Sequence, residues 1–384
     1  MSELSAPARL PLNVLQVGGL AGPGALAGGV WAVARMQSAA LARLGATVEL
    51  VGGWYGIPPA ARPESCEKIF RVRRPYRGAR LKLPIGVGMV RYVWNQGRQA
   101  DIVQLHLCRD FITTLSAVLL GRAAVPVIAQ AHGMLAAPAS RSLRLFDSLI
   151  FSRAIRAPRL WLTLTEAEER NLESLGVPRT RMRRVVNATG NPGAEWEDPE
   201  EATFLFVSRL APRKQPTVFV AAAIALLREG SQARFVVAGP DQGELGAVRA
   251  LIDASGFKDR FELPGELTES EVRKALARAT AVVLPARHEP YPMVIIEAAG
   301  VGTPIILTSE CGLSASLAQA EAAVIAEPVV SEFKSAMAAV EADAGLRHGL
   351  SKRARELHSR LWSAESLAER LIDFYAEAID AGRS

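Results

Sequence analysis

Short apolar runs alternate with segments of helical periodicity along most of the chain. Each run has the length of a buried strand, and most lead through a loop with Gly or Pro into apolar residues at helical spacing. The runs lie at residues 12–20, 47–53, 101–107, 125–134, 159–165, 203–210, 233–240, 261–267, 281–285 and 303–307. Because strands that alternate with helices are typical of parallel sheets, the pattern predicts the βαβ units of an α/β protein.

The alternation occurs in two series. Residues 190–201 separate them and are rich in Gly, Pro and acidic side chains, which is typical of an interdomain linker. A chain of 384 residues is also too long for one ordinary core. We therefore predict two doubly wound α/β domains that face each other across a cleft, with one amphipathic helix over residues 363–380 at the end.

The stretch from Arg287 to Ile306 carries the strongest chemical signal. It reads as a strand end, a loop, a helix stopped by Gly300 and Gly302, and the next strand. Glu289 precedes the helix, and Glu297 stands in an apolar segment, where an ionised carboxylate is costly unless it is hydrogen-bonded. Eight residues at helical rise span roughly 12 Å, close to the length of a sugar-diphosphate-ribose unit. Because a helix start also offers N–H groups to an anion, we expect the chemistry here.

Basic residues are concentrated in the first half. Residues 1–190 carry 25 Lys and Arg against 11 Asp and Glu, whereas the remainder carries 20 against 28. This excess suggests an anionic partner, either a phosphate-bearing ligand or membrane headgroups, although a solvated basic face has the same composition. The densest run, residues 71–82, lies beside aromatic and aliphatic residues and fits contact with an anionic membrane as well as a solvated loop.

Targeting signals and paired cysteines are lacking in the sequence. It contains no uninterrupted apolar run of membrane-spanning length and no basic N-terminus followed by a long apolar stretch. Cys66, Cys108 and Cys311 are scattered, odd in number, and fit no metal-ligand spacing. We expect a reduced, cytoplasmic compartment.

Two features near strand ends of the first half are candidates for ligand contact. Gly22, Gly24, Gly28 and Gly29 form a glycine-rich loop, but their spacing does not fit the dinucleotide fingerprint. The loop either brings backbone N–H groups to a phosphate or sugar, or is a surface turn. His132 ends another strand, at the edge where open α/β sheets bind ligands, with an ordinary surface loop residue as the alternative.

At these residues the chain resembles the retaining glycosyltransferases of family 4 (group 1), which have the GT-B fold of two Rossmann-like domains. The resemblance covers nearly the whole chain. Its most specific part is the pair of Glu289 and Glu297, which matches the family's E-P-x6-E-A-x3-G-x-P pattern. Further matches are Arg209 and Lys214 in SRLAPRK, His132-Gly133 in QAHGML, and Gly28-Gly29 in the first loop. The resemblance implies an acceptor-binding domain over residues 1–195, a nucleotide-sugar-binding domain over 196–361, and a C-terminal helix over 362–384 that crosses back to the first domain.

The resemblance also implies a role for each matching residue. Glu289 would hold the hydroxyls of the transferred sugar and oppose the positive charge developing on it, and Glu297 would bind the ribose hydroxyls. Arg209 and Lys214 would take up the negative charge of the leaving diphosphate, since an Arg fork and a mobile ammonium both suit phosphate oxygens. His132 would orient the sugar from the first domain. The remaining donor contacts are expected from Gly28, Gly29, Gly239, Gly265, Tyr291, Met293 and Val294.

The implied activity is transfer of a hexose-type sugar from a nucleotide-diphosphate sugar, such as a UDP- or GDP-sugar, to a glycan or lipid-diphosphate-linked acceptor with retention of anomeric configuration. Surface polysaccharide biosynthesis at the inner face of the membrane would suit such an acceptor, and neither a cofactor, a metal nor a nucleic acid is expected. A non-catalytic nucleotide-sugar-binding subunit and a nucleotide-sugar epimerase of the same fold are the alternatives. Because His288 and Tyr291 stand where the family often has smaller or different residues, we expect a distinctive donor-sugar pocket.

Overall fold

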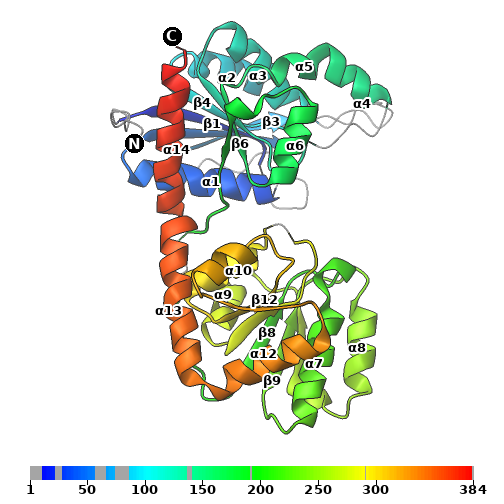
Figure 1. Ribbon diagram of the computed structural model, residues 1–384. Coiled ribbons are helices and arrows are strands. Elements are labelled where there is room, and N and C mark those ends of the chain that lie inside the picture. Colours follow the sequence, from blue (N-terminus) through cyan, green and yellow to red (C-terminus); the bar gives the residue numbers. More distant parts are fainter. Residues whose placement is uncertain are drawn as a thin grey trace. The chain divides into compact units, whose positions relative to one another are not determined.

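The computed structural model divides the chain into two compact units, and Figure 1 labels their elements. Unit 1 consists of Met1–Asn187 and Ala364–Ser384, and unit 2 of Ala188–Ser363. The structure describes residues 11–21, 28–56, 66–73, 86–135, 141–190, 193–289 and 291–382, with side chains from residue 30 in the first helix and from residue 144 in the fourth. Both units are α/β folds on a parallel sheet, so this part of the prediction is confirmed.

Unit 1 is built on a seven-stranded sheet with the strand order β3-β2-β1-β4-β5-β6-β7. The strands are β1 (Asn13–Leu20), β2 (Thr47–Tyr55), β3 (Glu67–Val72), β4 (Ile102–His106), β5 (Val127–Gln130), β6 (Leu160–Thr163) and β7 (Met182–Arg184). From β1 the chain first adds strands on one side and then, from β4, on the other. In open parallel sheets, ligands bind at the carboxyl ends of the strands at such a change of direction, here between β1 and β4.

Helices cover both faces of this sheet. They are α1 (Gly28–Arg43), α2 (Val87–Gly97), α3 (Phe111–Arg122), α4 (Arg141–Phe146), α5 (Ser152–Ala154), α6 (Glu166–Ser174) and the C-terminal α14 (Ala364–Asp380). Figure 1 shows α2 and α3 on one face and α1 on the other. Thr165 caps α6 as its sequence predicts, because its side chain accepts a hydrogen bond from Glu168 N. None of the helices among the described residues is long and apolar enough to cross a bilayer.

The helical segment that begins with α4 is not a regular α-helix throughout. A π-helical turn, Asp147–Phe151, separates α4 from α5. In this turn Asp147 accepts two hydrogen bonds from Arg109 Nε, at 3.0 and 3.1 Å, while the Arg109 guanidinium lies 5.3 Å from the centre of the Phe151 ring. The wider turn therefore places both side chains against one cation, a contact that helical periodicity alone does not reveal.

A buried polar network lies between the sheet and helices α1 and α14. Gln16, Gln104 and Gln130 interrupt the apolar runs of β1, β4 and β5, and all three are buried. Gln104 accepts a hydrogen bond from Tyr375 of α14 and donates to Gln37 of α1 at 2.8 Å, and Gln37 donates to Gln130 at 3.1 Å. Because buried polar groups need partners, this network fixes where α1 and α14 pack on the sheet.

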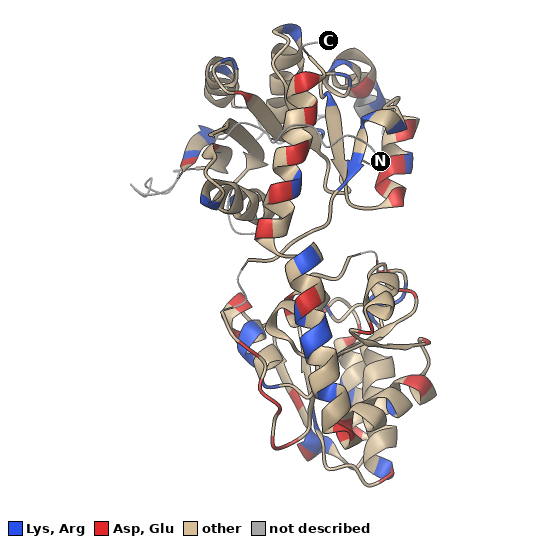
Figure 2. Ribbon diagram, turned by 60° about the vertical axis from the view of Figure 1, so that its left-hand side comes forward, with Lys and Arg blue, Asp and Glu red and all other residues tan. Residues whose placement is uncertain are grey.

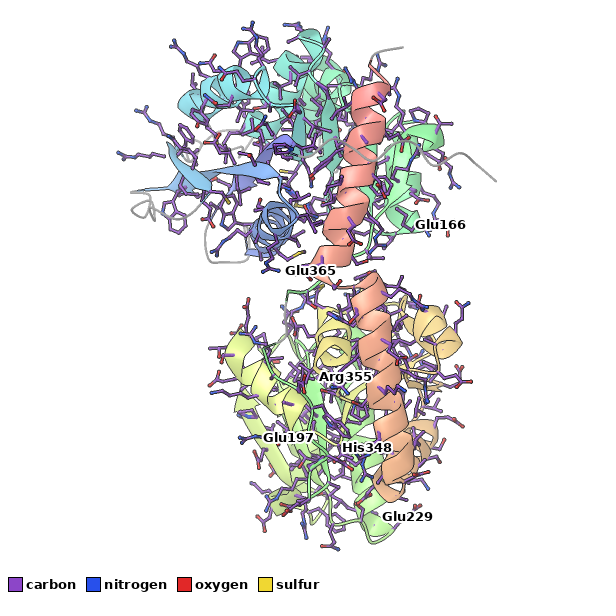
Figure 3. All side chains as sticks on the ribbon, turned by 90° about the vertical axis from the view of Figure 1, so that its left-hand side faces the viewer. Glu166, Glu197, Glu229, His348, Arg355 and Glu365 are labelled. Carbon is purple, nitrogen blue, oxygen red and sulfur yellow. The ribbon has the colours of Figure 1, made fainter. Side chains whose placement is uncertain are left out.

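The C-terminal helix α14 is amphipathic in both packing and charge. Its buried face consists of Ala364, Leu367, Ala368, Leu371, Tyr375 and Ala378. Acidic residues recur every fourth position on the outer side, and Figure 2 shows them along the helix. At its first turn Glu365, labelled in Figure 3, lies 2.5 Å from Arg43 of α1, and near its end Glu377 pairs with Arg183. The helix that follows unit 2 in the sequence thus packs on the basic unit 1.

Unit 2 is built on a six-stranded parallel sheet with the order β10-β9-β8-β11-β12-β13. Its strands are β8 (Thr203–Val207), β9 (Arg234–Ala238), β10 (Phe261–Gly265), β11 (Ala281–Leu284), β12 (Ile305–Thr308) and β13 (Val324–Ala326). Its helices are α7 (Pro216–Arg228), α8 (Leu245–Asp253), α9 (Glu269–Ala277), α10 (Met293–Val301), α11 (Ser314–Gln319), α12 (Val330–Ala342) and α13 (Ala344–Leu361). The change of direction lies between β8 and β11, whose carboxyl ends are therefore the expected ligand edge.

Helix α10 ends at one glycine, not at the two that the sequence suggested. Gly302 has a left-handed φ of 91° and donates to Ala298 O at 2.8 Å, as a helix C-cap does, whereas Gly300 lies inside the helix. A Cβ at Gly300 would lie 2.9 Å from His358, and one at Gly302 would lie 2.9 Å from Arg355. Both partners belong to α13, on which Figure 3 labels Arg355, so the glycines allow α13 to pack closely on α10.

Candidate active site

A buried ion pair lies at the carboxyl edge of the unit 2 sheet. Lys214 Nζ is 2.6 Å from Glu289 Oε2, and each residue is 7% exposed. Arg213 places a second cation 2.9 Å from the same oxygen, although its own side chain is 46% exposed. The loops that carry these residues follow β8 and β11, which are neighbours in the sheet. Two segments 75 residues apart thus form one charged cluster.

The loop after β8 turns Lys214 inward. Pro212–Lys214 forms a single 3-10 turn, and Gln215 then adopts the left-handed conformation with a φ of 52°. Helix α7 starts directly afterwards at Pro216, a position where the missing N–H of Pro costs nothing. Within this turn Arg213 remains exposed while Lys214 is buried.

The backbone around Glu289 is tied to two other loops. Arg287 N donates to Arg213 O, and Gly312 N donates to Glu289 O, each at 2.9 Å. Between them His288 has a left-handed φ of 48°, which is uncommon for a residue with a Cβ. Strained residues of this kind cluster at functional sites. These contacts hold the backbone at Glu289, and the ion pairs with Lys214 and Arg213 hold its carboxylate.

The cluster has an excess of positive charge. Burial lowers the pKa of Lys214, the hydrogen bond and charge of Glu289 raise it, and Arg213 and Arg209 lower it further. Burial and the ion pair hold Lys214 in place, so it is less mobile than the ammonium expected to contact the diphosphate. The Arg209 side chain is exposed, and no side-chain hydrogen bond or ion pair joins it to another residue that the structure describes, although its backbone carbonyl accepts from Ala211 N. The cations at this edge can attract an anion, and the carboxylate among them can stabilise a nearby positive charge.

One of the expected donor-binding glycines, Gly239, lies beside Arg209, and a second, Gly265, is hydrogen-bonded to Gly239. A Cβ on Gly239, whose φ is 139°, would lie 1.9 Å from Ser208 O and 3.3 Å from Arg209 N. Gly239 N donates to Gly265 O at 2.7 Å, and Gly265 has a φ of 82°. Gly239 is thus required for close packing of the β8 end, independently of any ligand.

The start of α10 offers backbone donors, as predicted. The helix begins at Met293, its N-cap is Pro292, and no side chain caps the first turn. The N–H groups of Met293 and Val294 have no partner within the helix, and the positive end of the helix dipole adds to them. Tyr291 is half-buried in the preceding loop, whereas Pro290 lies outside the described residues. His288 is exposed, with Nδ1 3.4 Å from Glu310 Oε2.

Glu297 lies in the second turn of α10 and is half-buried. Burial raises the pKa of its carboxyl, Glu269 raises it further, and Arg273 lowers it. Among the described residues none hydrogen-bonds to this carboxylate, so it is an acceptor without an internal partner. The helical-rise separation from Glu289 does not apply, because the four residues from Glu289 to Pro292 precede the helix.

In unit 1 the expected strand-end histidine is paired with a second histidine. His132 has a φ of 52°, and its Nε2 lies 2.7 Å from Nδ1 of His106, the last residue of β4. Burial lowers the pKa of His132 to about 4. The next residue, Gly133, donates its N–H to Glu168 Oε1 at 2.8 Å, and Glu168 Oε2 accepts from Leu164 N at 2.7 Å. The His-Gly turn is therefore held from two sides.

The remaining expected contacts of unit 1 lie at the start of α1. Gly28 and Gly29 form the first residues of this helix, not part of a loop as their sequence context suggested. Gly22 and Gly24 lie outside the described residues, as does most of the basic run over residues 71–82. The role of the glycine-rich segment therefore remains a prediction.

Three residues of these clusters do not stand out in the sequence. Arg213 is one of several cations in the polar loop before Lys214. His106 lies in the apolar run of β4, and Glu168 is one of several acids in the first turn of α6. A polar residue at the end of a buried strand is the signal that points to His106.

Solved structures that are similar to this chain in fold include glycosyltransferases of the GT-B fold. The Anabaena protein HepE, solved in complex with UDP, matches with a TM-score of 0.67, covering 95% of this chain and 100% of that one at 13% identity. At this identity the likeness shows the fold alone. The two parallel-sheet units therefore define a GT-B protein.

Family models then specify the class. The model "Glycosyltransferase Family 4" matches residues 27–189, and "Glycosyl transferases group 1" matches residues 192–357. The chain belongs to the family 4 (group 1) glycosyltransferases. It is 26% identical over 176 residues to the alpha-D-kanosaminyltransferase of Streptomyces kanamyceticus, and the match covers 45% of this chain and 45% of the relative. It is 31% identical over 197 residues to a D-inositol 3-phosphate glycosyltransferase of Saccharomonospora viridis, which covers 48% of this chain and 45% of the relative. The matched stretches thus span less than half the length of these relatives.

Proposed function

We propose that this glycosyltransferase moves a hexose-type sugar from a nucleotide-diphosphate sugar to a glycan or lipid-linked glycan, with retention of configuration, in surface polysaccharide biosynthesis. The observation that carries the proposal is the buried Lys214–Glu289 pair at the ligand edge of unit 2, beside an uncapped helix start. The bound UDP of HepE supports a uridine or related nucleotide as the leaving group. Cytoplasmic location is part of the same proposal.

The charges of the cluster suit the reaction. Cleaving the bond between the anomeric carbon and the diphosphate leaves negative charge on the phosphate and positive charge on the sugar. Arg209, Lys214 and the first N–H groups of α10 would take up the negative charge without a metal. Glu289 would stabilise the positive charge on the sugar. The leaving phosphate itself would accept the proton of the acceptor hydroxyl, so no separate base is assigned, and His132 would contact the transferred sugar.

The direct test is turnover with a panel of UDP- and GDP-sugars in the presence of EDTA. We expect one donor to release its nucleotide slowly by hydrolysis and faster when a suitable acceptor is added. Binding without any turnover would instead support a nucleotide-sugar-binding subunit, and interconversion of donors without acceptor would support an epimerase. Loss of turnover in EDTA that returns with Mg²⁺ would contradict metal independence.

The acceptor has a second candidate. The relative named as a D-inositol 3-phosphate glycosyltransferase favours a small soluble acceptor for this chain as well. The panel should therefore include D-inositol 3-phosphate beside lipid-linked acceptors. If only D-inositol 3-phosphate accelerates nucleotide release, a small soluble acceptor would be supported and the role in polysaccharide biosynthesis would be rejected.

Glu297→Gln should weaken nucleotide binding while it stabilises the ligand-free protein. A charged acceptor for the ribose hydroxyls contributes about 1.5–3 kcal/mol, so we expect Kd for UDP or GDP to rise roughly 10- to 100-fold. Because burial raises the folded pKa of Glu297 above 4.5, the folded state binds its proton more readily than the unfolded chain. The unfolding free energy therefore falls as pH rises from 4.5 through the folded pKa of Glu297. Because Gln carries no charge, Glu297→Gln removes this loss of stability at neutral pH.

Calorimetric titration and thermal unfolding measure both effects. A ligand at 100 times its Kd stabilises the protein by about 2.7 kcal/mol, so thermal shift also reports the loss of affinity. Glu356→Gln, an exposed carboxylate on α13, is the matched control and should change neither quantity. Unchanged nucleotide affinity in Glu297→Gln would remove Glu297 from the donor site.

A lipid-linked acceptor requires unit 1 to approach a membrane surface. The described part of unit 1 offers exposed Leu145 and Leu149, which are 60% and 56% exposed, near the exposed Arg144 and Arg153. Apolar side chains with flanking cations suit an anionic bilayer. We expect the double substitution of both leucines by Ser to weaken binding to vesicles containing phosphatidylglycerol at least about tenfold, because each Leu contributes about 1.5 kcal/mol or more when buried.

Co-sedimentation with these vesicles provides the measurement. Leu251→Ser, an exposed leucine of α8 in unit 2, is the control and should bind as the parent does. Equal binding by the parent and the double variant would shift the membrane contact to the run over residues 71–82. No binding by the parent would favour the soluble acceptor.

A further inference from the structure

Two histidines from neighbouring strands of unit 1 share one short hydrogen bond. Nδ1 of His106 lies 2.7 Å from Nε2 of His132, and the planes of the two rings differ by 19°. His106 is 1% exposed at the end of β4, and His132 follows β5, the next strand in the sheet. A contact between two ring nitrogens at this distance holds one proton, so one histidine donates and the other accepts.

The buried side of His106 decides the direction of this bond. Its Nε2 is fully buried, and no described residue hydrogen-bonds to it. If His132 donated, His106 would have to carry its own proton on Nε2, which would bury an N–H group without an acceptor. Orphaned buried N–H groups are rarer than orphaned acceptors because of their cost. His106 Nδ1–H therefore donates to His132 Nε2.

This direction fixes the tautomer of His132. With Nε2 occupied as an acceptor, the neutral ring carries its proton on Nδ1. The backbone is held as well, since Glu168 accepts from the N–H of Gly133. Burial opposes a positive charge on either ring by lowering the pKa of both, and a charge on His132 would oppose one on His106. Asp110 is a further buried acid near the end of β4, and its carboxylate accepts hydrogen bonds from Cys108 Sγ and Thr113 Oγ1.

We propose that His106 is a positioning residue for the transferase: it holds His132 neutral with its proton on Nδ1. His132 then acts as a hydrogen-bond donor to the sugar and not as a base. This inference rests on the proposed function, in which His132 contacts the transferred sugar. It adds a residue, His106, and a protonation state of His132 to the site residues described above. Removing His106 leaves His132 in place but frees its tautomer and ring orientation.

The tautomer can be read by NMR without any substrate. The chain has five histidines, so the full-length protein labelled with 15N-histidine gives few ring signals, and His132→Gln identifies those of His132. We expect a protonated Nδ1 and an unprotonated Nε2 for His132 in the parent, and averaged signals of exchanging tautomers in His106→Leu. A protonated Nε2 in the parent, or identical His132 signals in His106→Leu, would overturn the proposal.

Kinetics then separate positioning from folding. His106→Asn keeps an amide N–H near the place of Nδ1, whereas His106→Leu fills the space without a donor. We expect kcat to fall roughly tenfold to 100-fold in the Leu variant, with KM for the donor little changed, and to recover largely in the Asn variant. Equal losses in both variants, in proportion to lowered thermal stability, would indicate a structural role only.

The two readouts distinguish the two hypotheses. If no donor supports turnover in the parent, the proposed transfer fails, yet the NMR spectrum of the parent still decides the His106–His132 arrangement. If transfer occurs but His132 carries its proton on Nε2, only the positioning role fails. Should His106→Leu not fold, the parent spectrum and the Asn variant provide the same decision.

Discussion

Glu289→Gln is expected to lower kcat for transfer by roughly 100- to 1,000-fold while nucleotide binding remains measurable. In the proposed reaction Glu289 would stabilise the positive charge that develops on the sugar, and removing one fixed electrostatic partner of a transition state typically costs this much. Gln keeps the shape of Glu289 and an acceptor for Lys214 Nζ, 2.6 Å away. Turnover and calorimetric nucleotide binding on the same preparation check both parts of the prediction.

Glu289→Ala should give the same catalytic loss and an additional loss of stability. Lys214 is 7% exposed, and breaking a buried ion pair by removing one partner typically costs about 3–5 kcal/mol. Without Glu289 the folded pKa of Lys214 falls further below its unfolded value of 10.5, so the unfolded chain binds the proton more readily. The unfolding free energy of the Ala variant should therefore rise with pH from the folded pKa of Lys214 up to about 10.5.

A surface carboxylate of the same unit provides the control for both variants. Glu262, on β10, lies 3.9 Å from Arg234 and its side chain is 60% exposed. Glu262→Gln should leave turnover and unfolding close to those of the parent, because exposed ion pairs contribute little. Full activity in Glu289→Gln would refute the assignment of Glu289 to the reaction, whatever its effect on stability.

Gly239→Ala is expected to cost several kcal/mol of unfolding free energy, a large effect for a single methyl group. Its Cβ would lie 1.9 Å from Ser208 O, a backbone atom that cannot swing aside as a side chain can. The φ of 139° is in addition a conformation that residues with a Cβ avoid. Relief requires the end of β8 to move, and Arg209 with it. Urea unfolding should show a lower midpoint, and thermal shift a weakened response to UDP or GDP.

Gly246→Ala separates this effect from that of an ordinary methyl group. Gly246 lies within α8, and a Cβ there would meet no atom within 4 Å. Since Ala is favoured over Gly inside a helix, this variant should be more stable by roughly 0.5–1 kcal/mol. If Gly239→Ala unfolds at the same urea concentration as the parent, the close approach to Ser208 does not hold in solution.

The elements themselves follow from local sequence. Apolar runs of strand length and helical periodicity predicted parallel α/β units, and capping chemistry located the start of α6 at Thr165. These features depend on residues only a few positions apart, so a single stretch of sequence contains them. Local periodicity does not reveal a distant contact such as the one in the π-helical turn, where Asp147 accepts hydrogen bonds from Arg109.

The glutamate motif was readable from the sequence, but its arrangement was not. The spacing identified Glu289 and Glu297 as candidates, but the separation of roughly 12 Å assumed helical rise over all eight residues, whereas the helix begins only at Met293. Neither the burial of Lys214 nor the second cation, Arg213, follows from a loop sequence rich in polar residues. Their burial and pairing result from how the β8 and β11 loops lie against each other.

Local patterns in the sequence were enough to identify the class of fold, the family and the residues able to carry charge near the carboxyl ends of the strands. Which of these residues contact one another became clear only from the folded chain. Lys214 reaches Glu289 across 75 residues, and His106 reaches His132 across 26, because the strand order places β8 beside β11 and β4 beside β5. Strand neighbours are set by the packing of the whole sheet, which no short stretch of the chain encodes.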